Sequence, residues 1–193
     1  MKIKTLDKMF RDSVREYPES IIKTSNPLSE NNNDYLETSF RELGEIVSRL
    51  ALSLKDNGIE KGDKVAIMGK PHPRWAASFF AIQRVGAIAI PIDYALTYLE
   101  VRRILQESEA KIIMIQGNLR EELEKNIQLL PNLEKVVVYD GNPGEHFIAW
   151  DEFISDRKLE SSPESNTKDT TTIMYTSGTT GDAKGVMLSH HNL

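Results

Sequence analysis

Apolar residues recur at helical spacing in the first part of the chain. Leu6, Phe10 and Val14 mark one such stripe, which predicts an amphipathic helix over residues 5–17. The polar stretch 26–34 then predicts an exposed loop or hairpin tip. Next, Ser39-Phe-Arg-Glu42 has the form of a capping box, and the apolar stripe that follows it predicts a second, core-facing helix that ends at Asn57-Gly58.

From residue 61 onward, short apolar runs alternate with helical patterns. The runs are continuously apolar, which is typical of strands covered on both faces. They lie at 64–68, 87–92, 111–115 and 135–139, and the helical patterns between them at 71–85, 97–108 and 120–129. This alternation predicts an α/β fold with a parallel sheet and helical crossovers.

The pattern changes again after residue 139. Residues 140–147 are expected to form a turn region and Trp150 to Ile154 a single helical turn, before a polar, Ser- and Pro-rich connector. An apolar strand then leads into a glycine-rich loop. We therefore expect three portions: residues 1–155 as a first α/β subdomain portion, 156–169 as a connector, and 170–193 as a hairpin that begins a second, incomplete portion.

Composition narrows the function classes. The net charge of −5 gives no global electrostatic reason to bind nucleic acid, and the chain contains no cysteine, which excludes disulfides and thiolate chemistry. The N-terminal residues lack the apolar core of a secretory signal, and no apolar run approaches the length of a membrane span. These features favour a cytoplasmic location, either free or peripheral to a membrane.

The stretch YTSGTTGDAKGV (175–186) has the residue types of a phosphate-binding loop. Glycines let the backbone turn and approach a ligand closely, hydroxyl groups donate hydrogen bonds to phosphate oxygens, and a lysine adds a compact positive charge. A plain hairpin tip with a solvated lysine is the alternative. The candidate phosphate-binding residues are Thr176, Ser177, Gly178, Thr179, Thr180, Gly181 and Lys184.

The spacing excludes the common nucleotide-triphosphatase loop, G-x-x-x-x-G-K-[ST]. Counting five residues from Gly178 reaches Ala183, and Lys184 is followed by glycine. The dinucleotide-binding pattern G-x-G-x-x-G is absent as well. Because VMLS after the loop reads as a strand, we predict a strand–loop–strand hairpin.

YTSGTTGDAKGVMLSHHNL resembles the phosphate-loop signature of the adenylate-forming enzymes, the AMP-binding superfamily. GDKVAIMGKPHPRWAASFFAIQRVGAIAIPID and the segments around it are similar to the early part of that family's large N-terminal domain, so the resemblance runs from about Thr5 to the end. Within the family, the signature looks most like long-chain fatty acid–CoA ligases. Ala183 replaces a proline that the family usually carries there, and we expect a looser loop that keeps every donor.

The resemblance implies an ATP-dependent ligase. A carboxylic acid, here a fatty acid, would attack the α-phosphorus of ATP to give an acyl-adenylate, which then passes to coenzyme A. Residues Thr176 to Lys184 would hold the β- and γ-phosphates, and Thr176 would help to hold Mg²⁺. No residue of this chain is assigned a catalytic role.

In the family, the segments for adenine, ribose, the acyl group and the catalytic lysine follow this loop, and they are not found here. We therefore expect an N-terminal fragment that is inactive alone, cannot bind coenzyme A by itself, and self-associates through exposed apolar surface. Two alternatives stay open: a non-catalytic phosphate-binding or interaction module, and an adenylation domain that loads a carrier protein.

Other chemistry-bearing residues receive structural interpretations. Trp75, Phe79 and Phe80 are expected to pack in the core. The adjacent His190 and His191 are poor joint metal ligands, because neighbouring residues on a strand face opposite ways. All four histidines, which also include His72 and His146, are expected at the surface.

Overall fold

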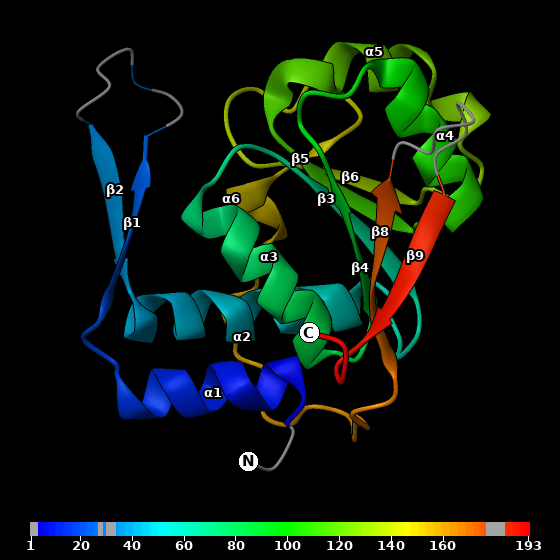
Figure 1. The fold of residues 1–193 in the computed structure, drawn as a ribbon. Helices are drawn as coiled ribbons and strands as arrows, with labels where there is room; N and C mark the ends of the chain where they lie inside the picture. Colours follow the sequence, from blue (N-terminus) through cyan, green and yellow to red (C-terminus); the bar gives the residue numbers. More distant parts are fainter. Residues whose placement is uncertain (1–3, 27–28, 30–33, 177–183) are drawn as a thin grey trace.

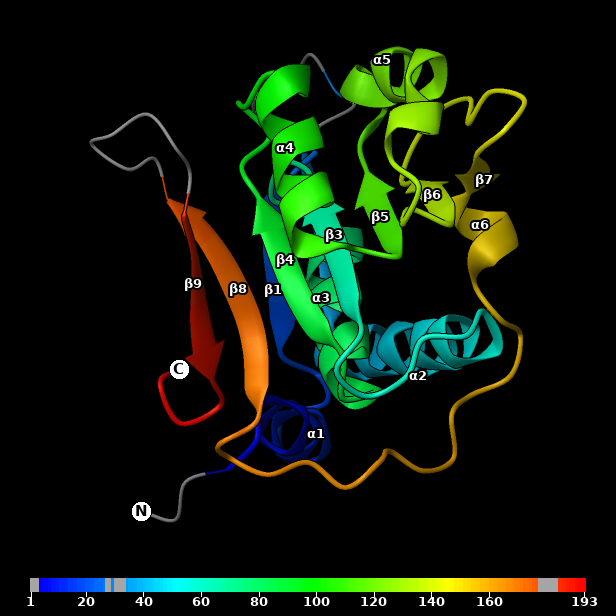
Figure 2. The ribbon, with the colours of Figure 1, turned by 90° about the vertical axis from the view of Figure 1, so that its right-hand side faces the viewer.

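A seven-stranded sheet forms the centre of the molecule, with strand order β7-β6-β5-β3-β4-β8-β9 (Figures 1 and 2). The computed structural model describes residues 4–26, 29, 34–176 and 184–193. All neighbouring strands run parallel except the last pair, β8 and β9, which is antiparallel. The strands are β3 (Lys64–Met68), β4 (Ile88–Ile92), β5 (Ile112–Ile115), β6 (Lys135–Val138), β7 (Ile148–Ala149), β8 (Thr170–Thr176) and β9 (Lys184–Ser189). The predicted parallel α/β sheet is confirmed.

Helices cover both faces of this sheet, and Figure 2 shows α4 in front of it and α3 behind. Two apolar cores result, one on each face. The first lies under α1 (Leu6–Glu16), α2 (Phe40–Asp56) and α3 (Pro73–Arg84), and the second under α4 (Tyr98–Ser108) and α5 (Arg120–Lys125). This double cover explains why the strands are continuously apolar. In the described part of the chain, no helix has both the length and the apolar character needed to cross a membrane.

Both predicted capping boxes are present. The Ser39 amide donates to Glu42 Oε2 at 2.8 Å, and the Glu42 amide donates back to Ser39 Oγ at 3.2 Å. The Thr97 hydroxyl donates to Glu100 Oε2 at 2.7 Å, and the Thr97 amide donates to the same oxygen at 2.8 Å. These bonds favour the ionised carboxylates, so they lower the pKa of Glu42 and of Glu100. The sequence signal therefore fixes where α2 and α4 begin.

Two local features differ from the expectation or add to it, and a third agrees with it. A separate antiparallel pair, β1 (Ile21–Ser25) and β2 (Tyr35–Ser39), flanks the polar stretch, so that stretch joins two strands. The helix expected over 120–129 stops at Lys125, and a 3-10 turn, η2 (Ile127–Leu129), follows, while α6 (Trp150–Phe153) is the predicted single turn. The Asn126 side chain donates to the carbonyl of Glu122 at 2.8 Å and so competes with the helix ladder where α5 ends.

The connector is anchored to the first core rather than loose on the surface. Leu159 is buried, its amide donates to the Ser48 carbonyl at 3.0 Å, and Ser48 Oγ donates to the Leu159 carbonyl at 3.2 Å. Arg49 Nε also donates to the carbonyl of Ser155 at 2.6 Å. The connector thus returns the chain to the sheet, where β8 pairs with β4. The division into portions at 156–169 stays a prediction.

Candidate functional site

The antiparallel hairpin β8–β9 carries the two described candidate residues at its open end. Thr176 ends β8, Lys184 begins β9, and the two are the last pair in the strand register. Both side chains are exposed. The predicted strand–loop–strand hairpin is therefore confirmed by its two strands. Ser177, Gly178, Thr179, Thr180 and Gly181 lie outside the described residues, and their binding role stays a prediction.

Gly185 lies directly below this open end and leaves room for a neighbouring ring. A Cβ atom built on Gly185 would lie 2.9 Å from Ile173 Cγ2 and 3.2 Å from Tyr175 Cζ, both closer than ordinary van der Waals contact. Tyr175 is the register partner of Gly185, so its ring lies across the glycine backbone. Burial, and secondarily the carboxylate of Glu107, raises the pKa of Tyr175. Glycine at this position therefore lets the tyrosine seat β9 against β8.

The open end of the hairpin lies at the carboxyl edge of the parallel sheet. Because β8 runs parallel to β4, Thr176 ends at the same edge as Met68, Ile92, Ile115 and Val138. In open α/β sheets, ligands bind outside the carboxyl ends of the strands. Thr176 and Lys184 therefore lie at the edge where this class of fold binds its ligands.

Polar groups that follow the other strands gather at this edge, and the sequence reasoning did not identify them. The Lys70 amide donates to Gln116 Oε1 at 2.7 Å, which joins the segments after β3 and β5. Arg74 donates to the Tyr139 carbonyl and to Asp140 Oδ1, the latter at 3.2 Å, which joins α3 to the segment after β6. In the sequence, these residues are marked only by their position. Each lies at or just beyond the end of a predicted parallel strand, or at the start of the crossover helix that follows it.

His72 caps the N-terminus of α3 instead of standing free on the surface. Its Nδ1 accepts from the Arg74 amide at 3.0 Å, and Pro73 occupies the first helical position. Burial lowers the pKa of His72, although the nearby carboxylate of Asp140 opposes this shift. The expectation that His72 is a surface residue holds only in part, because the ring is half-buried in a capping role.

The expectation of a surface position is wrong for His190. This side chain is buried, and its Nδ1 accepts from the Leu6 amide at 3.2 Å. The contact joins residues that are far apart in the sequence, so no local pattern announces it. His191, by contrast, is exposed as expected.

The aromatic side chains of α3 pack at the margin of the first core. Phe80 stacks on Phe10 of α1 with ring centroids 4.1 Å apart, and Trp75 stacks on Phe79 at 5.9 Å. All three α3 aromatics are partly buried against that core. The predicted packing role is confirmed, and it joins α3 to α1.

Metal-ligating residues do not cluster in the described ranges. No group of three or more His, Cys, Asp or Glu residues there could hold a metal ion. The exposed hydroxyl of Thr176 suits Mg²⁺ chemistry, since Mg²⁺ takes oxygen ligands and is commonly held by one or two protein groups together with phosphates and water. The assignment of Thr176 to Mg²⁺ stays a prediction.

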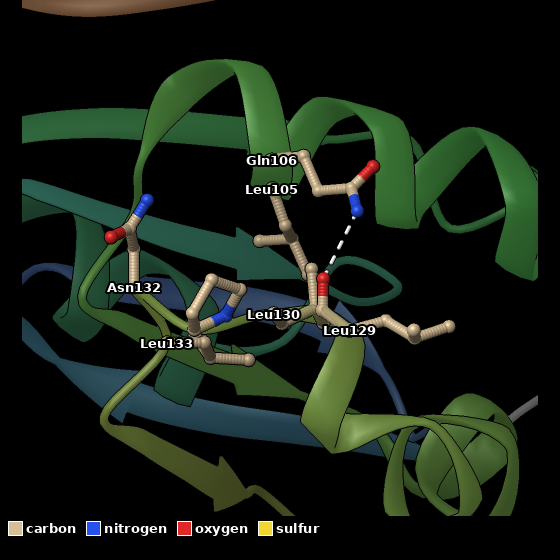
Figure 3. Close-up of a pocket in the computed structure, with 7 residues that line it drawn as sticks. Leu105, Gln106, Leu129, Leu130, Asn132 and Leu133 are labelled. Carbon is tan, nitrogen blue, oxygen red and sulfur yellow. Dashed lines mark hydrogen bonds between the residues drawn. The ribbon is translucent and has the colours of Figure 1, made fainter.

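An apolar pocket of about 320 Å³ lies between the second half of α4 and the segment that leads into β6 (Figure 3). Gln106 Nε2 donates to the Leu129 carbonyl at 3.0 Å across its mouth. Because residues 129–133 precede β6, the pocket lies toward the amino ends of the strands and away from Thr176. It is therefore separate from the phosphate-loop hairpin.

Comparison with known proteins shows a family to which this chain is similar. The family model described as "AMP-binding enzyme" matches residues 10–193. "Long chain acyl-CoA synthetase 4" of Arabidopsis thaliana is 30% identical over 96% of this chain and 30% of that protein. "Fatty acid--[acyl-carrier-protein] ligase ScoC" of Streptomyces coeruleorubidus is 32% identical over 80% of this chain and 28% of that protein.

Solved structures agree in fold. A long-chain-fatty-acid-CoA ligase from Archaeoglobus fulgidus superposes with a TM-score of 0.82 at 22% identity, over 98% of this chain and 37% of that one. At 22% sequence identity, this structural similarity shows a shared fold. The chain spans about 30% of the length of the plant synthetases that it matches.

Proposed function

The chain belongs to the AMP-binding enzyme family, and from that premise we propose that it is part of an ATP-dependent, AMP-forming ligase for a carboxylic acid. A long-chain fatty acid is the proposed substrate and coenzyme A the proposed acceptor. The observation that carries the proposal is the hairpin whose open end presents Thr176 and Lys184 at the carboxyl edge of the sheet. The similarity to the Arabidopsis thaliana synthetase supports the acid and the acceptor.

Each described residue of the hairpin has a proposed task. The Lys184 ammonium lies at the start of β9 and donates charge-assisted hydrogen bonds to the β- and γ-phosphates. The Thr176 hydroxyl, opposite Lys184, shares in holding Mg²⁺, which when bound neutralises phosphate charge. Ser177, Gly178, Thr179, Thr180 and Gly181 complete the donor set in this proposal.

The proposed reaction has two steps, formation of the acyl-adenylate and transfer of the acyl group to coenzyme A. A carboxylate oxygen bonds to the α-phosphorus as the bond from that phosphorus to the bridging oxygen of pyrophosphate breaks. The thiolate sulfur of coenzyme A then bonds to the acyl carbon, AMP leaves with the former carboxylate oxygen, and the thiol proton passes to solvent. In the first step the hairpin stabilises the leaving pyrophosphate, so its contribution is positioning and electrostatic.

A carrier-protein thiol is the second candidate acceptor. The similarity to the Streptomyces coeruleorubidus ligase, whose name specifies an acyl-carrier protein, favours it. Full-length protein with ATP, Mg²⁺ and a fatty acid should release pyrophosphate and form the acyl-adenylate. An added acceptor thiol, whose attack releases AMP, then separates the candidates. Acyl transfer to coenzyme A supports the first candidate, and transfer only to a phosphopantetheinyl carrier supports the second. Absence of acid-dependent pyrophosphate release would instead support a non-catalytic module.

The 193-residue chain is proposed to be inactive alone, since it spans only part of the length of its relatives. We expect no acyl-CoA when this chain is supplied with ATP, Mg²⁺, acid and coenzyme A. Complete turnover by the chain would contradict this point. The cytoplasmic location expected from the sequence stays a prediction.

Self-association of the isolated chain should depend on β9. Met187 of this strand is 70% exposed, and Met174 and Val186 also present apolar surface. Within the described residues β9 pairs only with β8, so its other edge can accept a second copy. Met187→Lys places a charge on that edge and should shift sedimentation toward the monomer, whereas Leu99→Lys, at an exposed leucine of α4, should leave it unchanged. Equal shifts in both variants, or a monomeric parent chain, would count against this surface.

A further inference from the structure

The base of the β8–β9 hairpin touches the first turn of α1. The Leu6 amide donates to His190 Nδ1 at 3.2 Å, and the His190 side chain is only 6% exposed. Figure 1 shows the lower end of β9 close to α1. The contact therefore joins the beginning of the described chain to its end, at the opposite end of the hairpin from Lys184.

The chemistry of this contact is that of a helix cap supplied from outside the helix. Leu6 is the first residue of α1, and amides in the first turn have no carbonyl partner within the helix. The N-cap hydroxyl of Thr5 accepts from Lys8 instead, at 3.3 Å. His190 Nδ1 satisfies the Leu6 amide, which requires a ring whose proton is on Nε2.

The surroundings favour this neutral ring. Burial lowers the pKa of His190, Lys61 acts in the same direction, and the carboxylates of Asp169 and Asp7 oppose both. Arg84 of α3 lies 3.7 Å from Asp7 and offsets part of that carboxylate's effect. The positive end of the α1 dipole also disfavours a second proton. The ring therefore acts as an acceptor around neutral pH.

The hairpin needs such an anchor because β9 is an edge strand in the described sheet. Its base is held by backbone bonds from His190 to the Asp169 carbonyl at 3.3 Å and from His191 to the Thr167 carbonyl at 2.9 Å. Both partners belong to the segment that leads into β8. The bond to Leu6 ties the base to a different element, which packs on the first core through Phe10.

We propose that His190 is a positioning residue: its imidazole fastens the base of the hairpin to α1 and so fixes how the hairpin presents Thr176 and Lys184. The claim that this contact affects catalysis through Thr176 and Lys184 rests on the proposed function. The contact between His190 and α1 is a feature of the fold and can be measured without any reaction.

Three variants distinguish the hydrogen bond between the Leu6 amide and His190 from other effects of substitution in this region. His190→Leu fills the buried position with an apolar side chain and removes the acceptor, so the buried Leu6 amide loses its partner. His190→Asn places an oxygen near the position of Nδ1 and should restore the bond. His191→Leu changes the exposed neighbour and leaves its backbone bond to Thr167 in place.

Amide hydrogen exchange on the chain tests the fastening. In His190→Leu, the Leu6 amide should exchange about tenfold faster, and amides of β9 should lose protection with it. His190→Asn and His191→Leu should stay near the parent. Unchanged Leu6 protection in His190→Leu would overturn the proposal, as would loss at Leu6 with β9 unaffected.

The pH profile provides a second readout if His190→Leu does not fold. The folded-state pKa of His190 is depressed, so the unfolded chain binds the proton first, and stability falls as pH drops below the unfolded value of about 6.5. Leu6 protection, corrected for intrinsic exchange, should fall in the same window in the parent but not in His190→Asn. An identical profile in the two proteins would overturn the proposal.

The full-length protein tests the catalytic part. His190→Leu should raise the KM for ATP several-fold in ATP–pyrophosphate exchange, and His190→Asn should reverse most of the increase. An unchanged KM together with lost Leu6 protection would overturn the link to catalysis. If the parent shows no acid-dependent exchange, the proposed function fails, and hydrogen exchange still decides the fastening.

Discussion

Replacing Lys184 by alanine in the full-length protein should lower kcat/KM for ATP–pyrophosphate exchange by about 10²–10³-fold. Lys184 is exposed at the start of β9, opposite Thr176, at the edge of the sheet where α/β folds bind ligands. In the proposed reaction its ammonium stabilises the departing pyrophosphate. Loss of a charge-assisted donor to phosphate oxygens therefore acts on the step that exchange measures.

The matched control is Lys168→Ala. Lys168 is an exposed lysine of the connector, close in sequence but outside the hairpin. The same change in formal charge there should leave exchange within about twofold, because exposed charges far from a site are screened by salt. Equal losses in the two variants would attribute the effect to net charge, and an undiminished rate in Lys184→Ala would remove the role given to this residue.

Leu50→Ala should lower the free energy of unfolding of the chain by about 2–5 kcal/mol. Leu50 is 0% exposed in the apolar stripe of α2, where it packs in the first core. The substitution removes buried methyl groups and leaves a cavity that the rigid sheet below cannot close. The expected cost is a large fraction of the stability of a domain of this size.

Leu99→Ala is the matched control for the core. It makes the same chemical change within a helix, but Leu99 of α4 is 63% exposed. Its cost should stay within about 0.5 kcal/mol. Urea unfolding monitored by circular dichroism measures both variants, with unchanged m-values as the sign that the denatured state is the same. Similar losses at the two positions would contradict the packing described for α2.

Local patterns predicted most of the fold because the decisive signals are local. The apolar runs of β3 to β6 and the capping boxes at Ser39 and Thr97 need no distant partner to be read. β7 was missed because it has only two residues, Ile148 and Ala149, too few to show a period. The early end of α5 was missed because the bond from the Asn126 side chain is one of several that asparagine can make.

The candidate site was predictable only in part, for a different reason. Thr176 and Lys184 belong to one short segment, so their spacing and residue types indicate phosphate binding without knowledge of the fold. The contact between Arg74 and Asp140 depends on the strand order that brings α3 next to the segment after β6. The burial of His190 depends on Leu6, which no pattern around His190 reveals. Contacts of this kind depend on how the strands and helices are arranged in space, so patterns of neighbouring residues in the sequence do not predict them.

Acid-dependent ATP–pyrophosphate exchange by the full-length protein, measured with fatty acids of graded chain length, tests the central claim most directly. Exchange reports reversible attack of a carboxylate on the α-phosphorus, the step to which the hairpin is assigned. The account predicts exchange that requires the acid and Mg²⁺, is strongest with long-chain fatty acids, and falls by about 10²–10³-fold in Lys184→Ala. Absence of exchange with every acid, or ATP cleavage to ADP and phosphate instead of AMP and pyrophosphate, would contradict it.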